Sequence, residues 1–388
     1  MPAFLSRGFR PFFLGAAVLA VVSMAAWLAI YLFDRRYDTT GMSPFLWHAH
    51  EMLFGYAMAV IGGFLLTAGW NWTGRKTAAG LPLAALFACW AGARVAMFGG
   101  PGGLAWAMFL DTAFLLGLLL ALARPVIAVR QIRQAPVLAI LLWLVAARVA
   151  AGLGALGEVP GGGRMGIYAA LYGVLALVLF MGRRVLPFFI QRGVGYEVEL
   201  RNDAWNDRAT IALFPAFALS ELLLPNHFIG ALLAAALFVL NTLRVMGWHT
   251  IGIWQRPLLW SLFMAFLMIN LGFMMRALML VTGIPVLLPI HAFALGGIGL
   301  MTLGMMIRVT LGHTGRNVHA ATPVITLLVS ALLASTILRI FMPLADPNQF
   351  WLWIGAAGGI WIATFALFIL VFGPMLVSPR ADEEPGKP

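Results

Sequence analysis

Residues 350–377 read FWLWIGAAGGIWIATFALFILVFGPMLV and carry no charged side chain. A helix rises about 1.5 Å per residue, so a segment of this length can cross the roughly 30 Å hydrocarbon layer of a bilayer. Backbone amides in lipid find no water, and such a segment must pair them internally, as a helix does. Comparable apolar stretches recur along the chain, which predicts an all-α, polytopic integral membrane bundle.

The recurring pattern predicts about twelve transmembrane helices, with Pro and Gly at most of the junctions between them. The expected spans are residues 11–33, 46–69, 80–98, 103–123, 136–156, 165–182, 209–224, 228–246, 257–281, 288–309, 322–343 and 350–377. We expect a single transmembrane domain over residues 1–388, and within it a short cytoplasmic tail at residues 379–388.

Composition excludes a soluble protein and a nucleic-acid-binding one. Hydrophobic residues make up 62% of the chain and charged residues 10%, whereas soluble domains carry about 25% charged residues. The net charge of +11 comes from basic residues that stand singly or in pairs in short loops, as in membrane proteins oriented by positive loops. We therefore expect the lipid bilayer as the main partner, and no nucleic acid.

The basic residues also predict the orientation. Of the 25 Lys and Arg residues, 18 fall on the side of the two termini. The other seven are Arg35, Arg36, Arg94, Arg148, Arg164, Arg276 and Arg339. The richer side is cytoplasmic by the positive-inside rule, which predicts an N-in, C-in topology. The second and tenth helices then run from outside to inside.

Those two helices share a motif. His50 precedes Arg75 by 25 residues, and His291 precedes Arg316 by the same 25. Between them Gly55, Gly63, Thr73 and Gly74 align with Gly296, Gly304, Thr314 and Gly315. The alignment suggests a parallel internal repeat, which would give the two helices equivalent positions.

Histidines at the outer ends of these helices are candidate metal ligands. His48, His50 and Glu51 open the second helix, and His291 opens the tenth. A lone His near a helix end is more often structural. Here two His residues stand close together, Glu51 lies on the helical face of His48, and a third His shares their depth. Neutral imidazole suits both copper and haem iron.

We expect His50 and His291 to meet and bind haem iron. Residues two apart on a helix point about 200° from each other. His48 therefore faces a different neighbour, and it either binds copper near Glu51 or hydrogen-bonds to another helix. His313, at the cytoplasmic end of the tenth helix, is a separate candidate. No Cys-x-x-Cys-His motif occurs, so any haem would be held non-covalently, as haem b.

Charged side chains inside the expected spans are the remaining candidates. Arg94, Arg148 and Arg276 lie in the outer halves of their helices, as do Arg339, Asp111 and Glu221. Snorkelling from helix ends explains such arginines in part. The alternative is a polar chamber in which guanidinium groups bind the carboxylates of a cofactor such as haem.

The chain resembles the NnrS family from near residue 7 to about residue 370. The resemblance is carried by the blocks Trp47 to Gly55, Asn71 to Arg75 and His291 to Arg316, with Arg10-Pro11-Phe12-Phe13 and Trp90 to Arg94. It implies a bacterial inner-membrane protein of about twelve helices that contains haem and copper. The family is connected with nitric oxide, denitrification and nitrosative-stress resistance.

One departure from the family concerns the second metal. Family members have a His in the ninth helix, after a Pro-Leu-Leu-Trp stretch, and here the corresponding position is Phe263. Two function hypotheses follow. The first is a haem and copper protein that binds or handles nitric oxide or its iron adducts. The second is a transporter or exporter whose histidines bind a metal or a proton.

Overall fold

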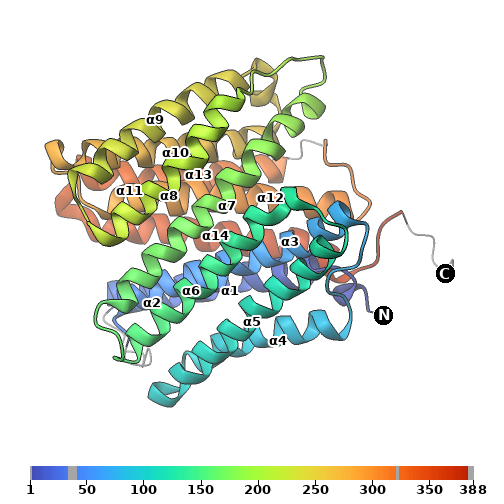
Figure 1. Cartoon of the computed structure of the whole chain (residues 1–388), viewed down its shortest axis with the longest axis horizontal. Coiled ribbons are helices and arrows are strands. Elements are labelled where there is room, and N and C mark those ends of the chain that lie inside the picture. Colours follow the sequence, from blue (N-terminus) through green and yellow to red (C-terminus); the bar gives the residue numbers. More distant parts are fainter. Residues whose placement is uncertain (1, 34–41, 320–322, 383–388) are drawn as a thin grey trace. The chain divides into compact units, whose positions relative to one another are not determined.

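The computed structural model describes residues 2–33, 42–319 and 323–382. The chain is 84% helical, and the described residues contain no strand (Figure 1). Within these described ranges ten α-helices are uninterrupted: α1 (Phe9–Phe33), α4 (Leu81–Ala96), α5 (Gly100–Ala128), α6 (Ala135–Ala155), α7 (Gly162–Gly193), α8 (Ala204–Leu223), α9 (Phe228–Trp248), α10 (Pro257–Thr282), α13 (Pro323–Ala345) and α14 (Phe350–Val377).

Two further segments are composite. The first consists of α2 (Pro44–His50), the π-helix η2 (Glu51–Ala57) and α3 (Met58–Thr73). The second consists of α11 (Leu287–His291), the π-helix η5 (Ala292–Gly299) and α12 (Leu300–His313).

Ten helical segments of the described residues are long and apolar enough to cross a membrane. Each predicted span overlaps a helix, but α4 is short and α8 does not meet the same criteria. The prediction of a multi-pass membrane protein is therefore confirmed, whereas the count of twelve and the N-in, C-in orientation stay predictions. Arg35, Arg36 and residues 383–388 of the expected tail lie outside the described residues.

The chain divides into two compact units. Unit 1 consists of Met1–Val174, Arg308–Val318 and Trp361–Pro388, and unit 2 of Leu175–Ile307 and His319–Ile360. The expected single domain over residues 1–388 stays a prediction.

Unit 1 has an aromatic core around α1. Phe12 packs against Phe114 of α5, with ring centroids 5.3 Å apart. A Cβ on Gly63 of α3 would lie 3.0 Å from the Cβ of Phe12, so this glycine lets α1 approach α3 closely. Trp361 Nε1 of α14 donates to the Ala20 carbonyl at 3.0 Å. These contacts pack α3, α5 and α14 against α1.

Unit 2 has a core around α10, which packs against α9 and η5. Phe273 of α10 meets Phe217 of α8 and Phe293 of η5, with centroids 5.5 and 5.0 Å away. A Cβ on Gly272 would lie 2.6 Å from the Phe293 ring. A small residue is therefore needed where α10 crosses the π-helix.

The two segments aligned as a repeat share their local structure. In each, a short α-helix ends at the aligned His, a π-helix follows, and an α-helix completes the span. Gly74 and Gly315 both adopt positive φ, of 66° and 74°. Thr73 and Thr314 each donate from Oγ1 at 2.7 Å to the carbonyl four residues back. The sequence match therefore corresponds to one repeated helix design.

Candidate functional site

The site in unit 1 begins at the junction of α2 and η2. Ser43 caps α2 by accepting from the Leu46 amide at 3.4 Å, and Pro44 occupies the first turn. Both features favour a helix start at this point. The π-helix begins one residue after His50, and π-helices often occur at functional sites. The change in winding accompanies a side-chain contact between adjacent residues: His50 Nδ1 lies 3.0 Å from Glu51 Oε1.

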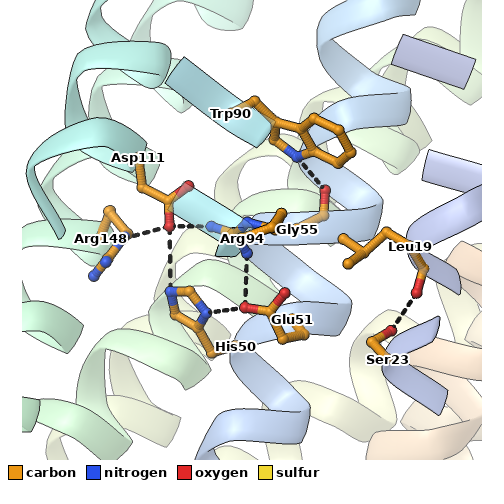
Figure 2. A network of polar contacts seen from close by, with 9 residues as sticks. All are labelled: Leu19, Ser23, His50, Glu51, Gly55, Trp90, Arg94, Asp111 and Arg148. Atoms are coloured by element: carbon orange, nitrogen blue, oxygen red, sulfur yellow. Dashed lines mark hydrogen bonds and ion pairs between the residues drawn. The ribbon is translucent and has the colours of Figure 1, made fainter. Parts of the chain in front are cut away.

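Five ionisable side chains meet here in one network (Figure 2). Arg94 of α4 donates from Nη1 to Glu51 Oε1 at 2.8 Å and from Nη2 to Asp111 Oδ2 of α5. Arg148 of α6 donates from Nε to the same Asp111 oxygen at 3.2 Å. His50 Nε2 lies 3.4 Å from that oxygen. Four helical segments are thus joined through two carboxylates.

The network is buried and balanced in charge. Side-chain exposure does not exceed 8% for Glu51, Arg94, Asp111 or Arg148. Two guanidinium groups face two carboxylates, so the formal charges cancel when His50 is neutral. Isolated charges inside a membrane are costly, and such groups usually pair with one another. The pairing allows four charged side chains to occupy the interior of the bundle.

Two neighbours shape the space around Arg94. A Cβ on Gly55 would lie 2.5 Å from Leu19 Cδ2 and 2.9 Å from Arg94 Nη1. Trp90, one helical turn before Arg94, donates from Nε1 to the Gly55 carbonyl at 2.9 Å. Glycine at position 55 therefore makes room for the guanidinium, and Trp90 fixes the π-helix beside it.

The predicted residues of the second helix separate in the structure. His48 stacks on Trp27 of α1, with centroids 4.6 Å apart and planes at 21°. His50 instead faces the network. Glu51, expected on the face of His48, directs its carboxylate to His50 and Arg94.

The other two candidate histidines have different surroundings. His291, in unit 2, lies with Nδ1 2.7 Å from the Leu287 carbonyl. A carbonyl only accepts, so Nδ1 carries the proton. His313, in unit 1, has Nδ1 3.3 Å from Arg7 Nη1 and packs against the ring of Phe9. The expected joint ligation by His50 and His291 stays a prediction.

The three candidate arginines all bind carboxylates of the chain itself. Arg94 and Arg148 share Asp111. Arg276 of α10 binds Glu221 of α8 through two hydrogen bonds of 2.8 and 2.6 Å. A Cβ on Gly230 would lie 2.1 Å from Glu221 Oε1, so glycine is needed beside this pair as it is beside the network.

These features belong to a chain whose sequence matches one protein family over nearly its whole length. The family described as NnrS protein matches residues 3–380. The chain belongs to the NnrS family. No curated protein sequence matches it. The resemblance predicted from the histidine blocks is thus confirmed, and membership is consistent with a role connected with nitric oxide.

Metal binding by this NnrS chain stays a prediction. Within residues 2–33, 42–319 and 323–382, no three His, Cys, Asp or Glu side chains are grouped as metal ligands. Phe263, at the position where the resemblance led us to expect a His, is buried, and its ring centroid lies 5.8 Å from that of His249. The π-helices were not predicted from the sequence, although aligned glycines mark both.

The sequence predicted only some of the residues in the network around Asp111. Asp111 was noted as an intramembrane charge but was given no ligand or cofactor role, although it joins three basic side chains. Trp90 lay in a recognised block, yet its bond to Gly55 depends on how α4 packs against η2. Packing between helices, which no single helix encodes, decides both contacts.

Proposed function

We propose that this NnrS protein is a multi-pass protein of the bacterial inner membrane that binds haem b and handles nitric oxide or its iron adducts. The proposed setting is denitrification or resistance to nitrosative stress. Family membership over residues 3–380 supports the connection with nitric oxide. The ten membrane-spanning candidates support an integral membrane location.

The observation that carries the haem proposal is the orientation of His291. Its Nδ1–H donates to the Leu287 carbonyl, so the lone pair of the neutral ring is on Nε2. Metal-binding histidines usually donate their other N–H in this way, which fixes the ring and raises its basicity. The donor chemistry of His291 therefore fits a residue that would hold haem iron through Nε2. The bound iron would supply the coordination chemistry for nitric oxide.

The other predicted haem contacts fit less well. Both ring nitrogens of His50 face carboxylates, an arrangement that suits an ion-pair network rather than an axial ligand. Arg94, Arg148 and Arg276 already bind Asp111, Glu51 or Glu221. Copper, near His48 and Glu51, is the less supported cofactor because Glu51 binds Arg94 and position 263 is Phe.

The test is an absorption spectrum with metal analysis of the purified protein. We expect a haem spectrum that His291→Ala shifts or abolishes while the protein remains in the membrane. His313→Ala, which removes a His at the other end of the same composite helix, should keep the spectrum. A haem that survives His291→Ala but disappears in His313→Ala would place the cofactor at the other end and overturn the assignment.

A second candidate function is favoured by the network itself. Ionisable side chains inside membrane helices often mark ion or proton pathways, and His50, Glu51 and Asp111 are such groups. A transporter that uses histidines to bind a metal or a proton would have this feature without haem. A folded, colourless protein would favour this alternative.

A further inference from the structure

A second charged cluster, in unit 2, has no role in the proposed function. It joins Arg183 of α7, Asp207 of α8 and Arg244 of α9, and we call it the Asp207 cluster. Arg183 Nη1 donates to Asp207 Oδ2 at 2.7 Å, and Arg244 Nη2 donates to Asp207 Oδ1 at 3.0 Å. Arg244 also binds Thr210 and Asn241, at 3.2 and 3.1 Å.

The Asp207 cluster carries an excess positive charge. Among the described residues, Asp207 is the one carboxylate that forms an ion pair with either guanidinium. The network around Asp111 and the Arg276–Glu221 pair are both balanced. An uncompensated charge within a membrane protein is costly, so the imbalance points to an anion.

The donors of the cluster are also incompletely used. Arg183 Nε is buried and has no hydrogen-bond partner. The side chain of Arg244 is 2% exposed, whereas those of Arg183 and Asp207 are 20% and 18% exposed. The cluster is therefore closed on the α9 side and partly exposed at Arg183 and Asp207, where an anion would approach the Arg183 side chain from its exposed side.

Exposed basic and aromatic side chains occur within five residues of Arg183 on α7 and within two residues of Asp207 on α8. Arg184 and Phe188 are exposed one turn apart on α7, and Trp205 and Arg208 are exposed on the first turns of α8. Trp and exposed basic residues are typical of the interface between lipid tails and water. Basic pockets between transmembrane helices bind the headgroups of anionic lipids.

We propose that the Asp207 cluster binds the phosphate of an anionic phospholipid, with Arg183 as its principal donor. Guanidinium groups match phosphate oxygens in geometry and charge. One phosphodiester, with a single negative charge, would neutralise the cluster. Exposed Phe188 and Trp205, on the same two helices, would give the acyl chains apolar contact that a free phosphate ion could not use.

The test compares phosphatidylglycerol with phosphatidylcholine. The purified full-length protein is delipidated in detergent, and each lipid is added during native mass spectrometry and thermal unfolding. We expect wild-type protein to retain phosphatidylglycerol in preference to phosphatidylcholine and to unfold at a higher temperature only with the former. Arg183→Gln should weaken retention about fivefold, since each basic side chain near a membrane surface contributes about 1 kcal/mol.

Two controls separate binding from folding and from net charge. Arg164→Gln removes an exposed basic side chain at the other end of α7 and should bind phosphatidylglycerol as wild type does. Arg208→Gln changes only an exposed side chain and should weaken retention even if Arg183→Gln fails to fold. Equal retention of both lipids by the wild-type protein would overturn the proposal. The proposal would also be wrong if Arg208→Gln and any folded Arg183→Gln retained as much phosphatidylglycerol as the wild-type protein does. If inorganic phosphate raised the unfolding temperature as much as phosphatidylglycerol does, the ligand of the cluster would be a free phosphate ion and not a lipid.

Discussion

Arg148 Nε lies 3.2 Å from Asp111 Oδ2, and each of the two side chains is 1% exposed. The same oxygen accepts from Arg94, so one carboxylate ties α4 and α6 to α5. Asp111 is consequently the residue on which the charge balance of this network depends most. Its removal leaves two guanidinium groups to share Glu51.

We expect Asp111→Asn to destabilise the protein by about 3–5 kcal/mol, because breaking a buried ion pair on one side leaves an uncompensated charge. Thermal or denaturant unfolding in detergent measures this loss. The double variant Asp111→Asn/Arg148→Gln restores the charge balance and should recover part of it. Glu158→Gln, which removes an exposed carboxylate, serves as the control. Unchanged stability of Asp111→Asn would mean that the network contributes little to folding.

Gly55→Ala should also destabilise the fold, by about 1–3 kcal/mol, the usual cost of overpacking. The added methyl would lie within 2.9 Å of both Arg94 Nη1 and Leu19 Cδ2. Gly102→Ala in α5 is a matched control, since nothing lies within 4 Å of the position of its Cβ. Equal unfolding temperatures for the two variants would contradict the close approach of Arg94 to η2.

The arginines that end the two repeat segments are expected to differ in importance. Arg316 Nη1 donates to the Thr314 carbonyl at 3.2 Å, and the Ala381 amide donates to the same carbonyl at 2.9 Å. The Arg75 side chain is exposed. Arg316→Ala should therefore lower the yield of folded protein more than Arg75→Ala does, as measured by size-exclusion chromatography. Normal yield with an altered absorption spectrum would argue instead for a cofactor contact.

The predicted N-in, C-in topology can be tested with reporter fusions. Fusions after residue 388 and in the loop near Arg201 should both report the cytoplasm, because the predicted spans put 18 of the 25 basic residues on the side of the termini, which the positive-inside rule makes cytoplasmic. A periplasmic signal at either position would reverse the depth of His50 and His291 in the membrane.

The sequence alone determined the class of the fold and the family. Apolar length dictates membrane helices, because hydrocarbon forces every backbone amide into an internal hydrogen bond. This rule acts on each segment separately, so the segments could be predicted without knowing their neighbours. The aligned His, Gly, Thr and Arg residues indicated two similar helices, and both composite segments have the same order of elements.

Tertiary structure alone decided which charges meet. The sequence placed Arg94, Asp111 and Arg148 at similar depth on three helices, but their contact depends on how those helices rotate and pack. The same packing turns His50 toward two carboxylates, while His291 donates to the carbonyl of Leu287 in its own helix. Two histidines at aligned positions thus acquire different chemistry. The reason is that the pairing of charges depends on how neighbouring helices pack, whereas apolar length is a property of each helix by itself.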